Sequence, residues 1–361
     1  MLYYLFDYLA QYYSGFNVFH YLTLRIILSA LTALFISLLI GPIIINILIN
    51  KKLYQTIRDD GPKSHLIKKS NTPSMGGLII IFSILISTLL WSDILNKNIW
   101  ILSFTIISFG LIGFYDDYKK FTLSSSSGIS GKTKLFWQIL FASLIIAFIF
   151  ITAIDSIEIS LMMPFLKHFS LYLGLFFIPW GILVIIGSSN AVNLTDGLDG
   201  LAILPCILIS AAFVLFAYVE GNFNIANYLL IPYLPGASEI AIFSSAIVGA
   251  GLGFLWYNSY PAEIFMGDIG SLSLGAVLAT IAVLLRLEII YAIMGGVFVA
   301  EALSVIIQVI SFKLFKKRVF KMSPIHHHFE LKGWPEPKII VRFWIITFVL
   351  VLIALASLKI R

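Results

Sequence analysis

Short polar motifs interrupt this apolar chain, and the longest runs from residue 190 to residue 200. Asn or Asp recurs there at every third position, so a helix end would carry these side chains down one side: Asn190, Asn193, Asp196 and Asp199. Their oxygens suit a metal ion, a ribose or a phosphate-bound Mg²⁺. A solvated turn is the simpler interpretation of the same pattern.

Two adjacent acids, Asp116 and Asp117, follow directly on an apolar run and precede Lys119 and Lys120. If that run crosses a membrane, the pair avoids most of the roughly 2.5 to 3.5 kcal/mol that a carboxylate costs at the centre of a span. Two carboxylates at this depth would hold Mg²⁺ or accept a proton from a lipid phosphate. The alternative is that they only end a helix.

A third motif, residues 265–271, places Asp268 between two glycines at the start of another apolar run. The amides of a helix N-terminus would favour a phosphate there, and the small neighbours suit a metal ligand or a nucleophile. A helix cap is the alternative for Asp268. Phe265 would stack on a base or anchor the chain at a membrane interface.

The fourth motif, residues 323–335, contains His326, His327 and His328. Three adjacent imidazoles cannot all face one point, so donors for a diphosphate are favoured over a zinc site. A polar loop is the alternative. The single cysteine, Cys206, lies in an apolar run and excludes disulfides within the chain. Residues 126–133 only resemble a phosphate-binding loop, because no strand precedes them, and Lys132 remains as a candidate phosphate contact.

The elements that must position these motifs are membrane spans. The chain has 361 residues, of which 60% are hydrophobic and 12% charged, whereas soluble domains are about 25% charged. Apolar runs of about 20 residues, enough to cross a membrane core, recur along its whole length. We therefore predict an all-α polytopic membrane protein, residues 1–361 forming one integral membrane domain. The ten predicted transmembrane helices are 21–49, 75–91, 99–115, 135–154, 171–187, 201–218, 240–256, 271–285, 289–312 and 339–358.

Positive charge is distributed unevenly over the two sets of alternate loops. Seventeen of the 24 lysines and arginines fall in one set and five in the other, leaving out Arg25 and Arg342 near span ends. The positive-inside rule makes the richer face cytoplasmic and puts both termini outside. All four motifs fall on that face, so we predict an active site at the cytoplasmic membrane surface. The ninth run exceeds the membrane thickness, and Gly295 and Gly296 would let it bend.

Taken together and in order, the motifs resemble those of the phospho-N-acetylmuramoyl-pentapeptide transferases. The resemblance extends over roughly residues 41 to 345 and includes Arg58 to Pro62 and Thr72 to Gly77. The acidic motifs are similar to those of the wider superfamily of polyprenyl-phosphate N-acetylhexosamine-1-phosphate transferases. The histidine loop, with Glu330, Lys332, Gly333 and Trp334, points to the muramoyl-pentapeptide branch.

The resemblance implies a reaction in the bacterial inner membrane. UDP-N-acetylmuramoyl-pentapeptide and undecaprenyl phosphate would give lipid I and UMP with Mg²⁺ as cofactor. It further implies that Asp268 and Asn193 bind Mg²⁺ and that Asp116 and Asp117 contact or deprotonate the lipid phosphate. The expected substrate-binding residues are Lys132, Asn190, Asn193, Asp196, Asp199, Phe265, His326, His327 and His328.

Two other functions are compatible with parts of the sequence. A secondary transporter would place ionisable residues near the membrane midplane, whereas these cluster at one surface. A sister transferase would use UDP-N-acetylglucosamine instead. Direct attack by the lipid phosphate is favoured over a covalent intermediate on Asp268, because a carboxylate occupied by Mg²⁺ is a poor nucleophile. A homodimer and the third residue of the pentapeptide are left open.

Overall fold

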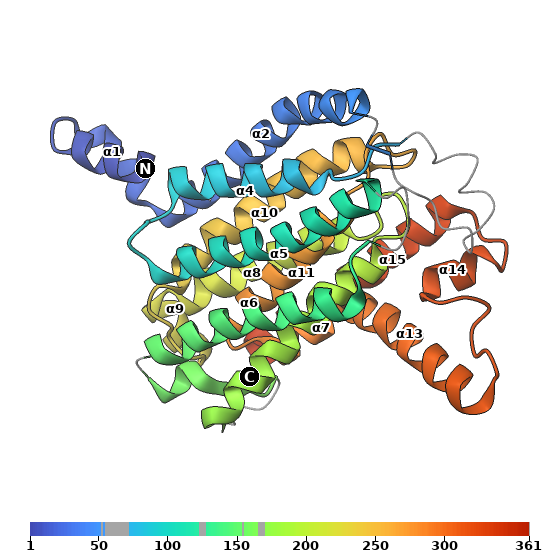
Figure 1. Ribbon diagram of the computed structural model, residues 1–361. Coiled ribbons are helices and arrows are strands. Elements are labelled where there is room, and N and C mark those ends of the chain that lie inside the picture. The colour runs from blue at the N-terminus through green and yellow to red at the C-terminus, as the bar shows by residue number, and fades with distance from the viewer. Residues whose placement is uncertain (52, 55–71, 123–127, 154, 165–169, 361) are drawn as a thin grey trace.

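The computed structural model describes residues 1–51, 53–54, 72–122, 128–153, 155–164 and 170–360. Within these residues the chain is almost entirely helical (Figure 1). The α-helices are α1 (Leu2–Ala10), α2 (Leu22–Asn50), α4 (Gly77–Trp91), α5 (Lys97–Thr122), α6 (Gly131–Thr152), α7 (Phe177–Thr195), α8 (Ile203–Glu220), α9 (Phe223–Leu229), α10 (Ala237–Asn258), α11 (Gly267–Leu284), α12 (Glu288–Met294), α13 (Gly296–Phe315), α14 (Ile325–Glu330) and α15 (Glu336–Ile360).

Nine helical segments in the described residues are long and apolar enough to cross a membrane, which makes this a polytopic membrane protein. The predicted span at 75–91 corresponds to α4, which has 15 residues and at 1.5 Å per residue is only about 22 Å long. It is an apolar helix below the length of the other nine. The finer prediction of ten transmembrane helices therefore depends on how α4 sits in the bilayer.

One small sheet departs from the all-α prediction. Strands β1 (Ser160–Met162) and β2 (Ser170–Tyr172) pair antiparallel, with Leu161 opposite Leu171. Short 3-10 helices precede α2, β1 and α7, at Ser14–His20, Ser156–Ile159 and Gly174–Phe176. The hairpin lies in the connection between α6 and α7, outside the long apolar runs, where hydropathy does not indicate a strand.

Helix α11 forms the centre of the bundle. In its most apolar window 83% of the residues are buried, compared with 22% in α13. It packs on α4, α5, α7 and α8, and its sequence is rich in Gly, Ala and Ser, which allow helices to approach closely in a membrane. Because Asp268 begins this helix, the most central element of the fold positions one of the predicted site residues.

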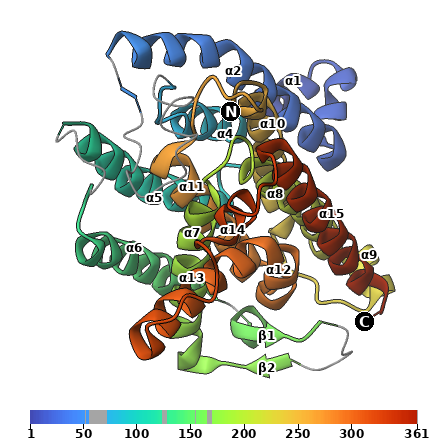
Figure 2. The ribbon, with the colours of Figure 1, turned by 90° about the vertical axis from the view of Figure 1, so that its right-hand side faces the viewer.

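The predicted bend in the ninth span is present. The run is divided at Gly295 into α12 and α13, and α13 diverges from the bundle toward the lower right of Figure 1. After α13 the chain returns to α14, which lies across the end of the bundle in the view of Figure 2. The histidine motif is thereby brought back over the ends of the other helices.

Two helices run further than predicted. The span expected to end at residue 115 continues as α5 to Thr122, so Asp116 and Asp117 lie inside its last two turns. The span expected to end at residue 187 continues as α7 to Thr195, so Asn190 and Asn193 belong to the helix. Polar residues on one helical face turn toward protein rather than lipid, and the hydropathy of the run alone does not reveal this.

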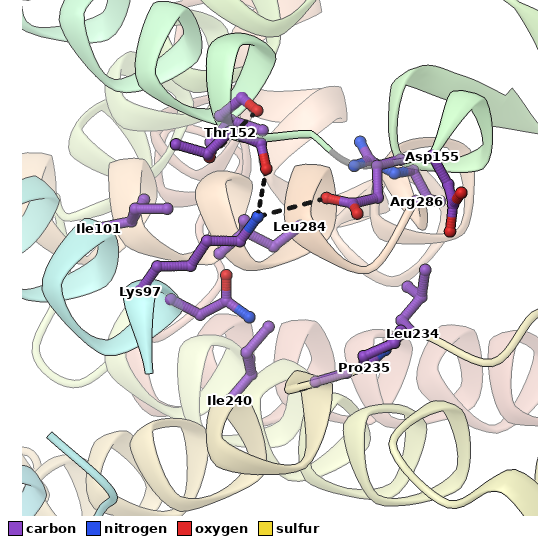
Figure 3. A pocket seen from close by; sticks show the side chains of 13 residues that line it. Lys97, Ile101, Thr152, Asp155, Leu234, Pro235, Ile240, Leu284 and Arg286 are labelled. Carbon is purple, nitrogen blue, oxygen red and sulfur yellow. Dashed lines mark hydrogen bonds and ion pairs between the residues drawn. The ribbon is translucent and has the colours of Figure 1, made fainter. Parts of the chain in front are cut away.

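A cavity of about 150 Å³, lined by both polar and apolar residues, lies at the end of the bundle where α5 begins (Figure 3). It is lined by Lys97, Arg286 and Asp155 among others, and Lys97 Nζ donates to the carbonyl oxygen of Thr152 at 2.7 Å. Lys97 begins α5, about 28 Å along the helix from Asp116. The cavity is therefore separate from the four polar motifs.

Candidate active site

Three carboxylates converge at one end of the bundle. Asp116 and Asp117 come from the last turns of α5, and Asp268 comes from the first turn of α11. One oxygen from each lies within 4.8 Å of the other two. Asp116 and Asp117 are buried, at 3% and 8% exposure. Bringing three acids so close together requires compensating positive charge.

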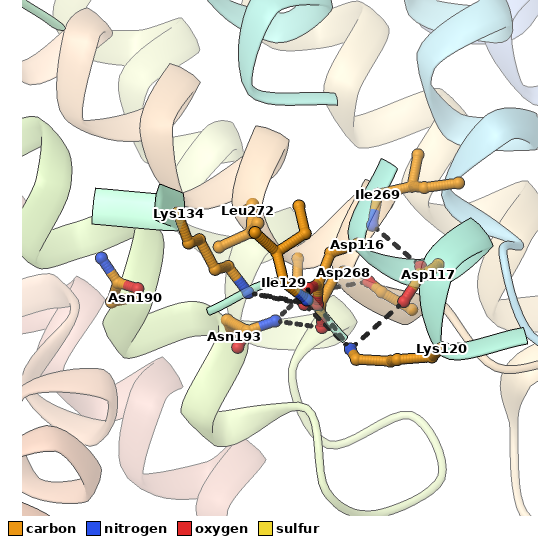
Figure 4. A network of polar contacts seen from close by, with 12 residues as sticks. Asp116, Asp117, Lys120, Ile129, Lys134, Asn190, Asn193, Asp268, Ile269 and Leu272 are labelled. Atoms are coloured by element: carbon orange, nitrogen blue, oxygen red, sulfur yellow. Dashed lines mark hydrogen bonds and ion pairs between the residues drawn. The ribbon is translucent and has the colours of Figure 1, made fainter. Parts of the chain in front are cut away.

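Two lysines supply that charge (Figure 4). Lys120 Nζ lies 2.7 Å from Asp116 Oδ2, 3.1 Å from Asp268 Oδ2 and 3.5 Å from Asp117 Oδ1. Lys134 Nζ, from α6, lies 2.6 Å from Asp268 Oδ2 and 3.6 Å from Asp116 Oδ2. The five side chains form one charged cluster with a formal charge of −1, counted from three carboxylates and two ammonium groups.

The start of α11 is shaped around Asp117 as well as Asp268. Gly267 has a φ of +72°, a region that side chains disfavour, and a Cβ there would lie 2.6 Å from Asp117 Oδ2. The same oxygen accepts a hydrogen bond from the backbone N–H of Ile269 at 3.3 Å. The carboxylates of Asp117 and Asp268 therefore both lie at the N-terminus of α11, where the backbone dipole favours negative charge.

Asp116 is bound to the connection between α5 and α6. Its Oδ1 accepts from the backbone N–H of Ile129 at 2.7 Å. The next residue, Ser130, accepts from the N–H of Thr133 and so caps the start of α6. This cap sets the first turn of the helix that carries Lys134.

The polar residues that recur at every third position between 190 and 200 have different partners in the structure. Asn193 Nδ2 donates to Asp268 Oδ1 and to Ser271 Oγ, both at 2.8 Å. The amide group of Asn190 instead contacts that of Gln138 in α6, and Asn190 Nδ2 donates to Gln138 Oε1 at 3.0 Å. Asn193 is thus in contact with the acid cluster, whereas the observed contacts of Asn190 join α7 to α6.

The turn that follows α7 is fastened by backbone contacts. Asp199 is 4% exposed and its Oδ2 accepts from the N–H of Ala262 at 3.1 Å, while its own N–H donates to Glu336. Gly200 N–H donates to Asn258 Oδ1 at 3.0 Å. Asp196 ends α7 and is half-buried. The turn is therefore joined to the segment that leads into α11.

Phe265 lies in that segment and is half-buried. Its backbone N–H donates to the carbonyl of Pro73 at 2.9 Å, and its carbonyl accepts from Gly76 at 2.9 Å. The segment before α4 is thereby paired with the segment before α11. Part of the 72–77 motif thus lies beside the acid cluster, whereas Arg58 to Pro62 falls outside the described residues.

The three histidines face different partners, as the sequence predicts. His326 is fully buried and its Nδ1 lies 3.0 Å from Glu301 of α13. His327 Nδ1 lies 2.6 Å from Glu330, three residues on in α14. His328 is half-buried at the surface of the loop, with a ring 5.7 Å from that of Phe320.

His328 is held as a neutral acceptor. Its Nδ1 accepts from the backbone N–H of Lys321 at 3.1 Å. Burial, and then the positive charges of Lys332 and Lys321, lower the pKa of His328 below its ordinary value of 6.5. The loop therefore uses this imidazole in its unprotonated form.

The lysines were only partly indicated by the sequence. Lys120 lies four residues after Asp116, a spacing that puts both on one helical face. Lys132, the predicted phosphate contact, is exposed on the first turn of α6, whereas Lys134, two residues later, contacts the cluster. No local pattern distinguishes these two lysines, because only the packing of α6 against α5 and α7 decides which of them faces the acids.

The cluster fits a hard divalent cation. Three carboxylates offer oxygen ligands within the reach of a single ion, and oxygen is the ligand type that such ions prefer. Asn193 directs its amide nitrogen at Asp268 and Ser271, so its carbonyl oxygen would face the same ion only with the amide group turned over. The acidic site is therefore a candidate metal centre.

The site combines paired acids on one membrane helix with a third acid in the first turn of another. The chain belongs to glycosyl transferase family 4, whose sequence profile matches residues 99–286. That range contains Asp116, Asp117, Lys120, Lys134 and Asp268.

A second match defines the activity within the family. Residues 69–81 match signature 1 of the phospho-N-acetylmuramoyl-pentapeptide transferases. The chain is thus a multi-pass enzyme of the bacterial inner membrane that transfers phospho-N-acetylmuramoyl-pentapeptide from its UDP carrier to undecaprenyl phosphate. The products are lipid I and UMP, and the function predicted from the sequence is confirmed.

Proposed function

We propose that the cluster of Asp116, Asp117, Asp268, Lys120 and Lys134 is where the phosphoryl group is transferred. The observation that carries this assignment is the convergence of three acids and two lysines from α5, α6 and α11 at one end of the bundle. Phosphoryl transfer depends mostly on positioning and on neutralising charge. A cluster that combines acids for a cation with bases for anions meets both requirements.

The cofactor of this site is Mg²⁺, held by Asp268 and Asn193. When bound, it would polarise the diphosphate of the sugar nucleotide and neutralise charge on the leaving group. The chemistry of the donors supports this choice, because all are hard oxygen ligands and Mg²⁺ commonly uses one or two carboxylates together with substrate phosphates.

Asp117 is the residue best placed to receive a proton from the lipid phosphate. Asp116 is engaged through both oxygens, by Ile129 and Lys120 at 2.7 Å. Among the residues that the structure describes, Asp117 Oδ1 has only the 3.5 Å contact with Lys120. A weakly engaged carboxylate oxygen is the better acceptor, so Asp116 orients Lys120 while Asp117 acts as general base.

The transfer then proceeds by direct attack. An oxygen of undecaprenyl phosphate bonds to the phosphorus that carries the sugar, and the bond from that phosphorus to the bridging oxygen breaks. UMP leaves with the bonding electron pair. Lys120 and Lys134, already between the acids, stabilise the negative charge on the transferred and leaving phosphates.

The covalent route through Asp268 makes a different prediction. It would release one equivalent of UMP per enzyme before any lipid acceptor is added. The contacts of Asp268 with Lys120 and Lys134 support the direct route, because nearby positive charge makes a carboxylate a poorer nucleophile. A rapid burst of UMP in the absence of undecaprenyl phosphate would refute the direct route.

The nucleotide occupies the side of the site formed by α7, the segment before α11 and α14. Phe265 would stack on uracil, and the remaining polar groups would contact ribose and diphosphate. These are Lys132, Asn190, Asn193, Asp196, Asp199, His327 and His328, whereas His326 is fully buried and would support the turn from behind. The position of the 196–200 turn beside the start of α11 supports this placement.

The site faces the cytoplasm and both termini lie outside. The positive-inside rule supports this orientation, because seventeen lysines and arginines fall in the loops on the side of the acid cluster and five in the others. The whole chain acts as a single membrane domain. A homodimer is a separate prediction, to be tested by the mass of the purified protein in detergent.

The decisive experiment measures Mg²⁺-dependent UMP release with undecaprenyl phosphate as acceptor. Asp268→Asn should abolish release while thermal unfolding stays unchanged within a few degrees. Asp155→Asn, at the far cavity, is the matched control and should retain wild-type turnover. Full activity in Asp268→Asn would show that Asp268 is not part of the site. The same assay with UDP-N-acetylglucosamine as donor tests the specificity for the sugar.

A further inference from the structure

Helix α13 is a mostly apolar span, and its sixth residue, Glu301, is its one acidic residue. Much of this helix is exposed along its length, yet Glu301 is fully buried. A carboxylate within a membrane span is unfavourable unless it is paired, and such residues usually mark function. Glu301 is therefore expected to have a specific partner.

Both oxygens of Glu301 contact the start of α14. Oε2 accepts from the backbone N–H of Ile325 at 2.7 Å, and Oε1 lies 3.0 Å from His326 Nδ1. Two turns further along α13, Gln308 Oε1 accepts from the N–H groups of Val319 and Phe320 at 3.0 and 2.9 Å. Residues seven apart share a helical face, so one face of α13 fastens the histidine loop at two places.

The contact with Glu301 decides which ring nitrogen of His326 carries a proton. A carboxylate oxygen accepts hydrogen bonds, so we assign the ring proton to Nδ1, which lies 3.0 Å from Oε1. Nε2 then points away from α13. It is buried and finds no hydrogen-bond partner in the part of the chain that the structure describes.

Nε2 points at the turn that ends α7. A Cβ built on Gly197 would lie only 2.3 Å from His326 Nε2, so the ring is packed directly against this glycine. Gly197 has Asp196 on one side and is two residues before Asp199. The position of one imidazole ring therefore affects the position of both acids in the turn.

We infer that Glu301 is a positioning residue for the sugar-nucleotide side of the active site. It holds His326 with the proton on Nδ1 and seats the ring against Gly197, which fixes the turn from Asp196 to Asp199. This inference depends on the proposed role of that turn in nucleotide binding. Because His326 is fully buried, its effect reaches the substrate through the turn and not by direct contact.

The first test is Glu301→Gln, which keeps the size of the side chain and removes its charge. An amide can either accept from Nδ1 or donate to it, so the ring is no longer confined to one tautomer. The KM for UDP-N-acetylmuramoyl-pentapeptide should rise about tenfold, the loss expected for one charge-assisted hydrogen bond. The KM for undecaprenyl phosphate should stay unchanged. The ¹⁵N shifts of His326 should change from Nδ1-protonated in the wild type to a mixture.

Glu239→Gln is the matched control. Glu239 is also a buried helix carboxylate, 2.9 Å from Arg25, and lies at the end of the bundle away from the acid cluster. The control should lower thermal stability without changing either KM. If Glu301→Gln lowered only thermal stability, or changed both KM values equally, Glu301 would be structural and the inference would be wrong.

A second variant approaches the same ring from the other side and leaves α13 intact. Gly197→Ala places a methyl group against Nε2 and must displace the ring or the turn. Its effect on the sugar-nucleotide KM should not add to that of Glu301→Gln, because both act through His326. Additive effects would overturn the inference. Failure of the wild-type enzyme to release UMP would instead contradict the function itself, so the two failures are distinguishable.

Discussion

Lys120 and Asp116 lie one helical turn apart on α5, and their side chains meet at 2.7 Å inside the acid cluster. The same ammonium group reaches Asp268 on α11 at 3.1 Å. Lys120 thus joins the paired acids of α5 to the single acid of α11, as Lys134 does from α6. A cation in this position both holds the carboxylates together and presents positive charge to a phosphate.

Replacing Lys120 should therefore reduce turnover strongly. Lys120→Met removes a charge that we place next to the transferred phosphate, and the loss of one such group lowers kcat by about 100-fold or more. Initial rates of UMP release at saturating substrates measure it. Lys119→Met is the control, because it removes the same charge one residue earlier in the helix. Similar losses in both variants would indicate a general effect of charge and not a role for Lys120.

The two lysines of α6 give a second prediction. Lys134 contacts Asp268 at 2.6 Å, whereas Lys132 is exposed. Lys134→Met should lower kcat by about tenfold or more, and Lys132→Met should lower it less. Kinetics of the two variants, measured side by side, compare the sequence-based choice with the structural one. A larger effect at Lys132 would mean that α6 rotates when substrates bind.

These two lysines show what the sequence can predict. The acids were found because Asp116, Asp117 and Asp268 interrupt long apolar runs, and because alternate loops must lie on one face of a membrane. Their convergence follows from the packing of α5 on α11. The choice between Lys132 and Lys134 depends on the rotation of one helix about its axis, and a uniformly apolar span gives little information about that rotation.

Glu301 shows the opposite case. A single acid in an apolar span is visible in the sequence, but its partner is 25 residues away in a different helix. Only the return of the chain from α13 to α14 brings Glu301 to His326. Likewise, the sequence placed Asn190 and Asn193 in one motif, while the structure gives them contacts with different helices. The spacing of residues along a helix predicts which side chains share a helical face, but it does not predict which neighbouring helices they contact.

Gly267 gives a third prediction, on the geometry of the cluster. Gly267→Ala puts a side chain at φ +72° and a Cβ within 2.6 Å of Asp117. The backbone conformation alone should lower the free energy of unfolding by about 1 to 2 kcal/mol. Displacement of Asp117 should lower UMP release as well. Thermal unfolding in detergent and initial rates measure the two effects.

The control for this substitution is Gly131→Ala. Gly131 also begins a helix, but its Cβ would meet no atom within 4 Å in the described parts of the chain. This variant should keep wild-type stability and turnover. If both alanine variants behaved alike, the close packing of Gly267 against Asp117 would not be what restricts this position.

His328 gives the last prediction, on pH. The pKa of His328 is lowered in the folded protein, so the unfolded state binds the proton more readily. Stability that depends on this group is therefore present above the unfolded pKa of about 6.5 and is lost as pH falls toward the folded value. Protonation also removes the lone pair that accepts from the Lys321 N–H. Hydrogen-exchange protection of that amide should decrease as pH falls below about 6.5.

His328→Asn separates this effect from general acid sensitivity. The Asn side-chain oxygen can take the place of Nδ1 as acceptor but does not titrate in this range. Protection at the Lys321 amide should then be independent of pH between about 5 and 7. Loss of protection with the same pH profile in His328→Asn would assign the titration to another group of the loop, because the imidazole that accepts from this amide would no longer be present.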